Sequence, residues 1–116
     1  MDLIKVREHQ RKFVTERLWE KFHNPKNLVM ALAGETGELL EIFQWLTAEE
    51  SQGLMKDPKR AEQVRHEIAD IFYYLVRLTD LLDIDLEKAF WEKMELNAKR
   101  YPAEKAKGQA KKYTEL

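Results

Sequence analysis

Apolar residues recur every three or four positions along most of the chain, and no stretch alternates apolar and polar residues as a half-buried strand does. Polar segments containing Pro or Gly separate the periodic runs. The pattern predicts an all-α fold, a four-helix bundle whose helices cover roughly residues 3–22, 26–46, 58–82 and 85–100. The polar connection after the second helix has room for one short helical turn.

The helix starts carry local signals. Asp2 and Asp85 precede periodic runs and are predicted N-caps, because a short carboxylate accepts hydrogen bonds from the first free backbone amides. Pro25 and Pro58 are predicted to open the second and third helices, where a missing amide costs nothing. The fourth helix should stop before Pro102.

The predicted end of the fourth helix before Pro102 divides the chain into a domain and a tail. We expect one domain over residues 1–101 and a Lys-rich, weakly periodic tail over 102–116. The tail is predicted to be mobile unless a neighbouring subunit holds it.

The second helix carries carboxylates inside its apolar stripe. At about 100° per residue, Glu35 lies within about 40° of Leu28, Leu39 and Leu46, and Glu38 flanks the stripe by about 60°. A glutamate in the middle of a core-facing stripe needs a compensating partner in the interior.

The third helix repeats the arrangement. Glu67 lies within about 40° of Ile71, Tyr74 and Leu78, and Asp70 flanks it by about 60°. If the two stripes pack antiparallel, the E-x-x-E and E-x-x-D pairs bring four carboxylates into one cleft.

Four converging carboxylates repel one another, and a divalent cation relieves that repulsion better than protonation does. The chain has no cysteine, and His66 is turned about 100° from Glu67, so the predicted ligands are all oxygens. Such a site selects Mg²⁺, with Mn²⁺ as a substitute. A di-iron bundle is disfavoured because Glu20 and His23 supply only one of its two Glu-x-x-His motifs.

The fourth helix has a stripe that changes from apolar to polar. Lys93, Asn97 and Arg100 continue the line that begins with Leu86 and Phe90, where they are placed to meet phosphate oxygens. The alternative is that the long cationic side chains only cover apolar surface at the end of a bundle.

Two tryptophans at helix ends, Trp19 and Trp45, are candidates for stacking on a nucleobase, with His23 and Asn27 supplying hydrogen bonds. The balance of 20 basic and 21 acidic residues argues against duplex nucleic acid or an anionic membrane as a partner. We find no signal-peptide core and no long apolar span, so a cytoplasmic location is the expectation.

The segments "NLVMALAGETGELLEIFQW" and "EIADIFYYLVRL" resemble the MazG-type all-α nucleotide pyrophosphohydrolases, whose motif is E-x-x-E, a spacer and E-x-x-D. Similarity to the dCTP pyrophosphatase branch of that family extends through "WEKFHNPKNL", "KMELNAKRYP" and "KYTEL". Thr36 stands where a small or aliphatic residue is expected, which should not disturb the ligands.

The resemblance implies a MazG-type bundle that hydrolyses a dNTP, most simply dCTP or a 5-modified dCTP, to dNMP and pyrophosphate with Mg²⁺. It also implies a homodimer or homotetramer. The implied metal ligands are Glu35, Glu38, Glu67 and Asp70, with Glu35 or Glu38 activating water. The implied phosphate-binding residues are Lys93, Asn97, Arg100 and Tyr101, and the implied base- and sugar-binding residues are Trp19, His23, Trp45 and Tyr74.

Two other functions stay open at this level. A broader house-cleaning enzyme would hydrolyse non-standard dNTPs with the same site. A helical interaction module would use the acidic cleft only as a cation-binding brace.

Overall fold

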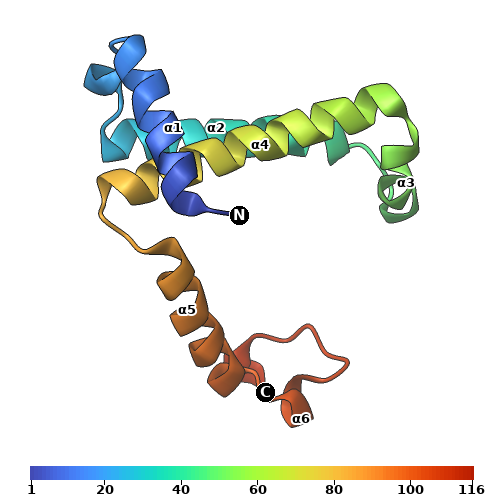
Figure 1. Ribbon diagram of the computed structural model, residues 1–116. Helices are drawn as coiled ribbons and strands as arrows, with labels where there is room; N and C mark the ends of the chain where they lie inside the picture. Colours follow the sequence, from blue (N-terminus) through green and yellow to red (C-terminus); the bar gives the residue numbers. More distant parts are fainter. The chain divides into compact units, whose positions relative to one another are not determined.

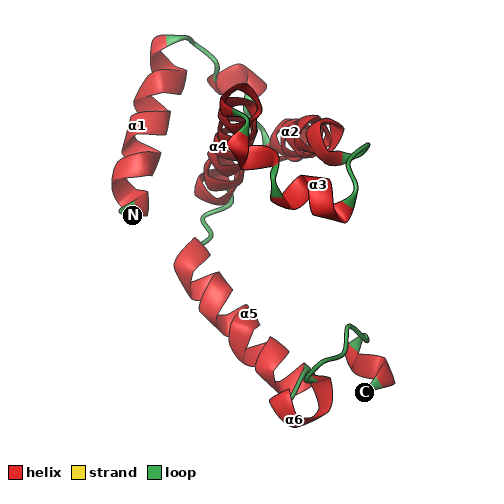
Figure 2. Cartoon of the chain, turned by 90° about the vertical axis from the view of Figure 1, so that its right-hand side faces the viewer, coloured by secondary structure: helices red, strands yellow, loops and turns green.

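The structure, a computed structural model, describes all residues 1–116, and it contains helices and no strand (Figures 1 and 2). The all-α prediction is therefore confirmed. The elements in chain order are α1 (Leu3–Glu16), η1 (Glu20–Phe22), α2 (Pro25–Phe43), α3 (Ala48–Gln52), η2 (Leu54–Lys56), α4 (Pro58–Leu81), α5 (Leu86–Arg100), α6 (Ala103–Ala106) and η3 (Tyr113–Glu115), where η marks a 3₁₀ helix.

The chain forms two compact units, Met1–Asp83 and Ile84–Leu116. The first contains α1, α2 and α4 with the short elements between them, and the second contains α5, α6 and η3. No helix is both long enough and apolar enough to cross a membrane.

Helices α2 and α4 lie side by side and run in opposite directions (Figures 1 and 2). Asn24 caps α2 by accepting a hydrogen bond from the amide of Asn27, and Pro25 follows it. Asp57 caps α4 in the same way, and Pro58 follows it. The starts of both helices are therefore set by local chemistry that is visible in the sequence.

The first helix is shorter than the sequence predicted, ending at Glu16 instead of near residue 22. Leu18 adopts a left-handed backbone conformation with φ 54°, and the amide of Trp19 donates to the carbonyl of Val14 at 3.0 Å. This is the hydrogen bonding of a Schellman C-cap, with Leu18 in the position that glycine usually takes. Because no glycine marks it, the end of α1 is not apparent in the sequence.

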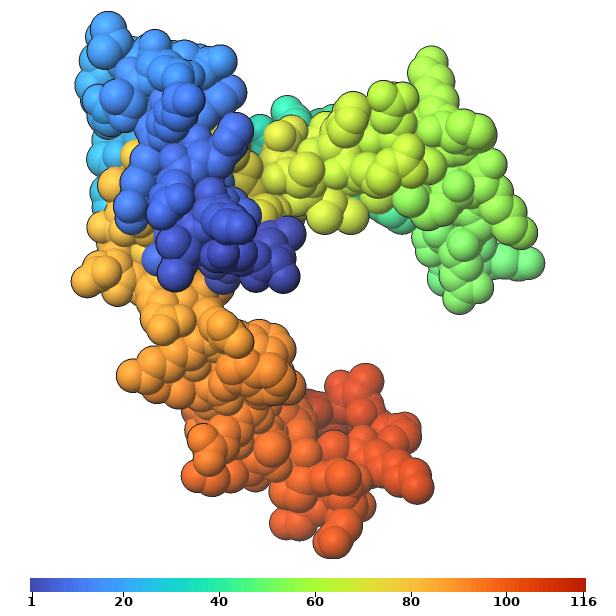
Figure 3. All heavy atoms as spheres, viewed as in Figure 1, coloured from blue at the N-terminus to red at the C-terminus, as the bar shows by residue number.

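The connection between α2 and α4 is more ordered than the one helical turn that was predicted. Thr47 and Glu50 form a reciprocal capping box that starts α3, and η2 follows. Leu54 of η2 is buried and holds the connection against α4. This segment lies at the end of the α2–α4 pair that is far from α1 (Figure 3).

The core of the first unit lies where α1, α2 and α4 meet. Val14, Leu28 and Val76, one from each helix, are 0%, 1% and 0% exposed. Burial of each such side chain stabilises the fold by about 1.5–3 kcal/mol. Helix α1 is also held to α4 through the side-chain amide of Gln10, which donates to the carbonyl of Tyr73 at 2.9 Å.

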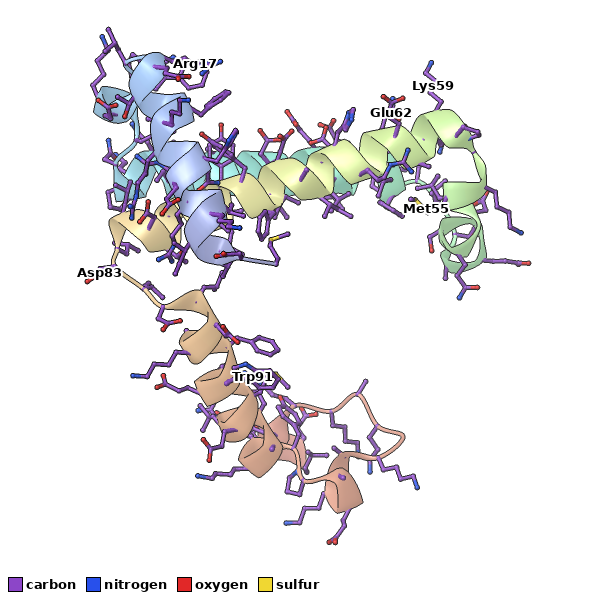
Figure 4. All side chains as sticks on the ribbon, in the orientation of Figure 1. Arg17, Met55, Lys59, Glu62, Asp83 and Trp91 are labelled. Carbon is purple, nitrogen blue, oxygen red and sulfur yellow. The ribbon has the colours of Figure 1, made fainter.

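In the second unit, α5 runs from Leu86 to Arg100, and Asp85 is its N-cap, as predicted. The predicted start at residue 85 is therefore one residue early. Trp91 projects from this helix and is largely exposed (Figure 4). The C-terminal segment folds back on the end of α5. The ring of Tyr113 lies 6.0 Å from that of Tyr101, and the guanidinium of Arg100 lies 4.6 Å from the centre of the Tyr113 ring.

Candidate active site

Three carboxylates from the two acidic pairs converge between α2 and α4. Glu35, Glu38 and Glu67 each offer an oxygen, and the three oxygens lie within 4.8 Å of one another. Glu35 and Glu38 are one turn apart on α2, and the antiparallel packing of α4 brings Glu67 to them. We call these three residues the carboxylate cluster.

The cluster is only partly solvated. One oxygen each of Glu35 and Glu67 is buried without a hydrogen-bond partner, whereas Glu38 is exposed. None of the three forms an ion pair with a lysine or arginine of the chain. A buried carboxylate oxygen without a partner is costly, so the site is short of positive charge.

The electrostatics follow from burial and mutual repulsion. Burial raises the pKa of Glu35 from its ordinary value of 4.5 to about 7, with further contributions from hydrogen bonding to Glu38 and from the charges of Glu38 and Asp70. Burial and the charge of Glu38 also raise the pKa of Glu67. Burial and the repulsion between neighbouring carboxylates both disfavour the charged forms of Glu35 and Glu67.

Asp70, the fourth predicted ligand, lies at the edge of the cluster. Its charge contributes to the raised pKa values of Glu35 and Glu67, and it lines a cavity together with Glu35. It is not among the three residues whose oxygens lie within 4.8 Å of one another. The four predicted carboxylates thus lie in one region of the structure, and the oxygens of three of them lie within 4.8 Å of one another.

The donor set fits a hard divalent cation. It consists of carboxylate oxygens, two of which are buried and lack a partner. Mg²⁺ and Mn²⁺ prefer such oxygens, whereas zinc and iron sites normally include His or Cys.

A polar hollow of about 520 Å³ opens beside the cluster. Glu38 and Glu67 form one part of its wall, and Arg60 and Gln63 of α4 form another. Arg60 and Gln63 are not among the site residues predicted from the sequence. Their signal is helical spacing, since residues 60, 63 and 67 lie along one side of α4.

An aromatic cavity of about 430 Å³ lies on another side of the cluster. Three of the four predicted base- and sugar-binding residues, Trp19, His23 and Tyr74, line it together with Glu35 and Asp70. Phe13, Phe22 and Tyr73 complete the wall. Phe13 is not among the predicted site residues, because its helical spacing is equally that of a core residue.

Trp45, the fourth predicted residue of this kind, does not line the aromatic cavity. It follows the C-terminal end of α2 and is 86% exposed. Its predicted contact with a base stays a prediction.

His23 accepts a hydrogen bond from Arg77, which is not among the site residues predicted from the sequence. The Arg77 Nε–H donates to His23 Nδ1 at 3.3 Å, and the Arg77 side chain is 7% exposed. Burial, and secondly the charge of Arg77, lower the pKa of His23. Arg77 was hard to single out because it follows a buried valine in an apolar stretch and nothing local reveals its partner.

The predicted phosphate-binding residues all belong to the second unit. Lys93, Asn97 and Arg100 are on α5, and Tyr101 caps its C-terminal end. Their role stays a prediction.

Comparison with known proteins finds a matching family and similar named proteins. The model of the MazG-like family matches residues 30–116. Human dCTP pyrophosphatase 1 is 42% identical over 111 residues, which are 96% of this chain and 65% of the human protein. The rat protein of the same name is 41% identical over the same shares. This chain therefore spans slightly less than two thirds of the length of these relatives.

A solved structure agrees with the sequence comparisons. A pyrophosphatase from Archaeoglobus fulgidus DSM 4304 superposes with a TM-score of 0.79 at 38% identity, and the match covers 84% of this chain and 90% of that one.

Proposed function

The chain belongs to the MazG-like family, and from that membership we propose that it is a Mg²⁺-dependent nucleoside triphosphate pyrophosphohydrolase that converts a dNTP to dNMP and pyrophosphate. The observation that carries the proposal is the carboxylate cluster, with two buried oxygens that have no partner. Similarity to proteins named dCTP pyrophosphatase 1 favours dCTP as the substrate, and the resemblance of the sequence motifs extends the proposal to a 5-modified dCTP.

Glu35, Glu38 and Glu67, with Asp70 at their edge, would hold the cation. When bound, Mg²⁺ would neutralise phosphate charge and lower the pKa of the attacking water. The carboxylates face one another across α2 and α4, so their positions are fixed by helix packing before substrate arrives. Such preorganisation places the charges without reorganisation during the reaction.

Glu38 is the best candidate to orient or deprotonate the attacking water, with Glu35 as the other. Glu38 is the exposed member of the cluster and also lines the polar hollow. Its carboxylate can therefore reach a water molecule outside the buried part of the site. The chain has no cysteine, and no serine or threonine lines either cavity, so we propose direct attack by water without a covalent enzyme intermediate.

Lys93 and Asn97 are proposed to bind phosphate oxygens or their metal, with Arg100 and Tyr101 nearby. Lys93 is exposed and makes no ion pair, which leaves its ammonium available for an anion. Arg100 lies against Tyr113, whose ring restricts the movement of the guanidinium.

The aromatic cavity is the proposed binding site for the base. Trp19 and Tyr74 offer rings for stacking, and His23 offers a hydrogen bond at the same wall. Glu35 and Asp70 line the cavity too, so a base bound there would lie next to the proposed metal site.

A broader house-cleaning pyrophosphatase is the second candidate. Aromatic walls accept any base by stacking, and this observation favours a wide substrate range. A helical interaction module is the third possibility, and it requires no nucleotide binding at all.

One experiment separates these functions. The purified chain is incubated with Mg²⁺ and, in turn, each common dNTP and 5-substituted dCTP, and the products are separated by ion-exchange chromatography. We expect dCMP and pyrophosphate, with higher kcat/KM for dCTP or its 5-modified forms. Equal kcat/KM for many bases would favour the broader enzyme. Failure of every dNTP to react, together with no heat on titrating α,β-imido dCTP and Mg²⁺, would favour the interaction module.

A further inference from the structure

Arg77 joins the aromatic cavity to the packing of α1 on α4. Its Nε–H donates to His23 Nδ1 at 3.3 Å, and its Nη1 donates to Asp80 Oδ2 at 3.4 Å. Both Arg77 and Asp80 have side chains that are 7% exposed. Asp80 also accepts two hydrogen bonds from Arg11 of α1, at 2.6 and 2.8 Å. The guanidinium of Arg77 is therefore fixed on one side while its Nε–H faces the imidazole.

The contact determines which nitrogen of His23 carries a proton. A guanidinium has only donors, so the ring nitrogen that faces it must be an acceptor. A neutral imidazole with an unprotonated Nδ1 carries its proton on Nε2. The other tautomer would direct an N–H group at the N–H group of Arg77.

The surrounding charges agree with a neutral ring. The negative charge of Asp80 is already paired with Arg11 and Arg77, so it does not neutralise a positive charge on the His23 ring. Glu35 and Asp70 line the same cavity and would favour an imidazolium, but burial and the charge of Arg77 dominate and lower the pKa of His23.

The backbone of His23 is also held in place. The His23 amide donates to the carbonyl of Glu20 at 3.1 Å, which ends η1, and Asn24 directly afterwards caps α2. The His23 Nε2 makes no hydrogen bond within the chain, and His23 lines the aromatic cavity. Its N–H is available to a ligand there.

We propose that Arg77 is a positioning residue that holds His23 as the Nε2–H tautomer, so that the aromatic cavity presents a neutral hydrogen-bond donor to the substrate. This rests on the proposed function in one respect, namely that the cavity receives a nucleobase. The donor selects a base whose edge offers an acceptor there, a ring carbonyl or an unprotonated ring nitrogen. A base with an amino group at the same point would direct its N–H at the Nε2–H of His23, and the two donors would disfavour its binding.

The tautomer is measured by two-dimensional ¹H–¹⁵N NMR of the imidazole rings in the full chain at pH 8, where a free histidine is neutral. Assignment uses the His23→Gln variant. We expect wild-type His23 to show a protonated Nε2 and an unprotonated Nδ1. The Arg77→Met variant, which has no donor, should show exchange between tautomers, and Arg77→Lys should restore the wild-type state in part. Lys12→Met, which removes an exposed cation of α1, is the matched control and should change nothing.

Binding and turnover give the second readout. Arg77→Met should weaken binding of α,β-imido dCTP about three- to tenfold, the effect of one mispositioned hydrogen bond. KM for dCTP should rise while kcat changes little, because Arg77 does not touch the carboxylate cluster. If circular dichroism shows that Arg77→Met does not fold, the NMR spectra of wild type and Arg77→Lys still report the tautomer of His23 and test the proposal.

The inference is overturned if wild-type His23 populates the Nδ1–H tautomer, or if folded Arg77→Met keeps a pure Nε2–H tautomer. These spectra need no catalysis. If the chain hydrolyses no dNTP, the proposed function is refuted. The Arg77–His23 inference is then still tested separately by the NMR spectra.

Discussion

Glu38 differs from the other members of the carboxylate cluster because it is exposed, while Glu35 and Glu67 each bury an oxygen without a partner. Their placement in apolar stripes could be predicted from helical periodicity. The approach of three of them to within 4.8 Å, with Asp70 at the edge, depends on the offset between α2 and α4. Helical periodicity gives the angle of a residue around its own helix but no offset along a neighbouring one.

Glu38→Gln keeps the shape of the side chain and removes its charge. We expect turnover of dCTP to fall about 100-fold or more, because losing a metal ligand removes several kcal/mol of charge stabilisation. The metal-free variant should melt at a higher temperature than wild type, since one source of repulsion is gone. Kinetics and differential scanning calorimetry check both effects.

Glu62→Gln is the control for this change, because Glu62 lies on α4 and points into solvent away from α2 (Figure 4). Its activity and melting temperature should match those of wild type. Wild-type activity in Glu38→Gln would remove Glu38 from the proposed metal site.

The raised pKa of Glu35 predicts how stability depends on pH. The folded state holds the Glu35 proton up to about pH 7, whereas the unfolded chain releases it near 4.5. Stability from this group is therefore full below 4.5 and is lost as pH rises through 7. In EDTA, the melting temperature of wild type should fall more between pH 5 and pH 8 than the melting temperature of Glu35→Gln does. Identical pH profiles for the two proteins would show that Glu35 titrates normally.

Mg²⁺ should reverse this loss for wild type at pH 8, because a ligand that binds only the folded state stabilises it. The same addition should raise the melting temperature of Glu35→Gln much less. A calorimetric series at increasing Mg²⁺ concentration measures the difference.

Among the elements, α2, α4 and α5 could be located to within three residues because Asn or Asp caps and prolines mark their starts. Helix α1 was misjudged at its C-terminal end, where Leu18 takes a left-handed conformation that glycine usually occupies. This early end matters for the site, because the turn after α1 carries Trp19 and His23 to the aromatic cavity. The interaction that fixes His23, its hydrogen bond with Arg77, joins residues 54 positions apart and has no local pattern.

The docking of α1 on α4 should depend strongly on Asp80. Asp80→Asn would leave the buried guanidinium of Arg77 without its counter-charge, and we expect a loss of about 3 kcal/mol in the free energy of unfolding. Urea denaturation followed by circular dichroism measures this loss.

Asp57→Asn is the matched control, because Asp57 pairs with Arg60 at 3.9 Å on the surface and asparagine is an equally good helix cap. Its cost should stay below about 1 kcal/mol. Equal effects of the two substitutions would show that the Asp80 contacts do not stabilise the docking of α1.

At the scale of the whole molecule, the α2–α4 pair exposes large apolar side chains. Val29, Met30 and Leu40 of α2 and Ile68 of α4 are 51%, 62%, 60% and 53% exposed. Exposed apolar side chains are used in interfaces between subunits, so we propose that they contribute to the homodimer or homotetramer that the family resemblance implies. The sequence could not show this surface, because apolar residues of a core and of an interface follow the same helical period.

Light scattering after size-exclusion chromatography tests the assembly. We expect a mass of at least twice the 13.9 kDa of one chain. Met30→Glu should lower that mass by placing a charge in the interface, while the exposed Lys12→Glu should not. A wild-type mass of 13.9 kDa would exclude a stable homo-oligomer.

The central claim is that the carboxylate cluster holds the cation that this chain uses to release pyrophosphate from a dNTP. The most direct test is ³¹P NMR of dCTP mixed with wild type or Glu38→Gln, each with Mg²⁺ and with EDTA. We expect dCMP and pyrophosphate from wild type with Mg²⁺ and almost no product in the other three samples. Orthophosphate with dCDP, or equal rates with Mg²⁺ and with EDTA, would contradict it.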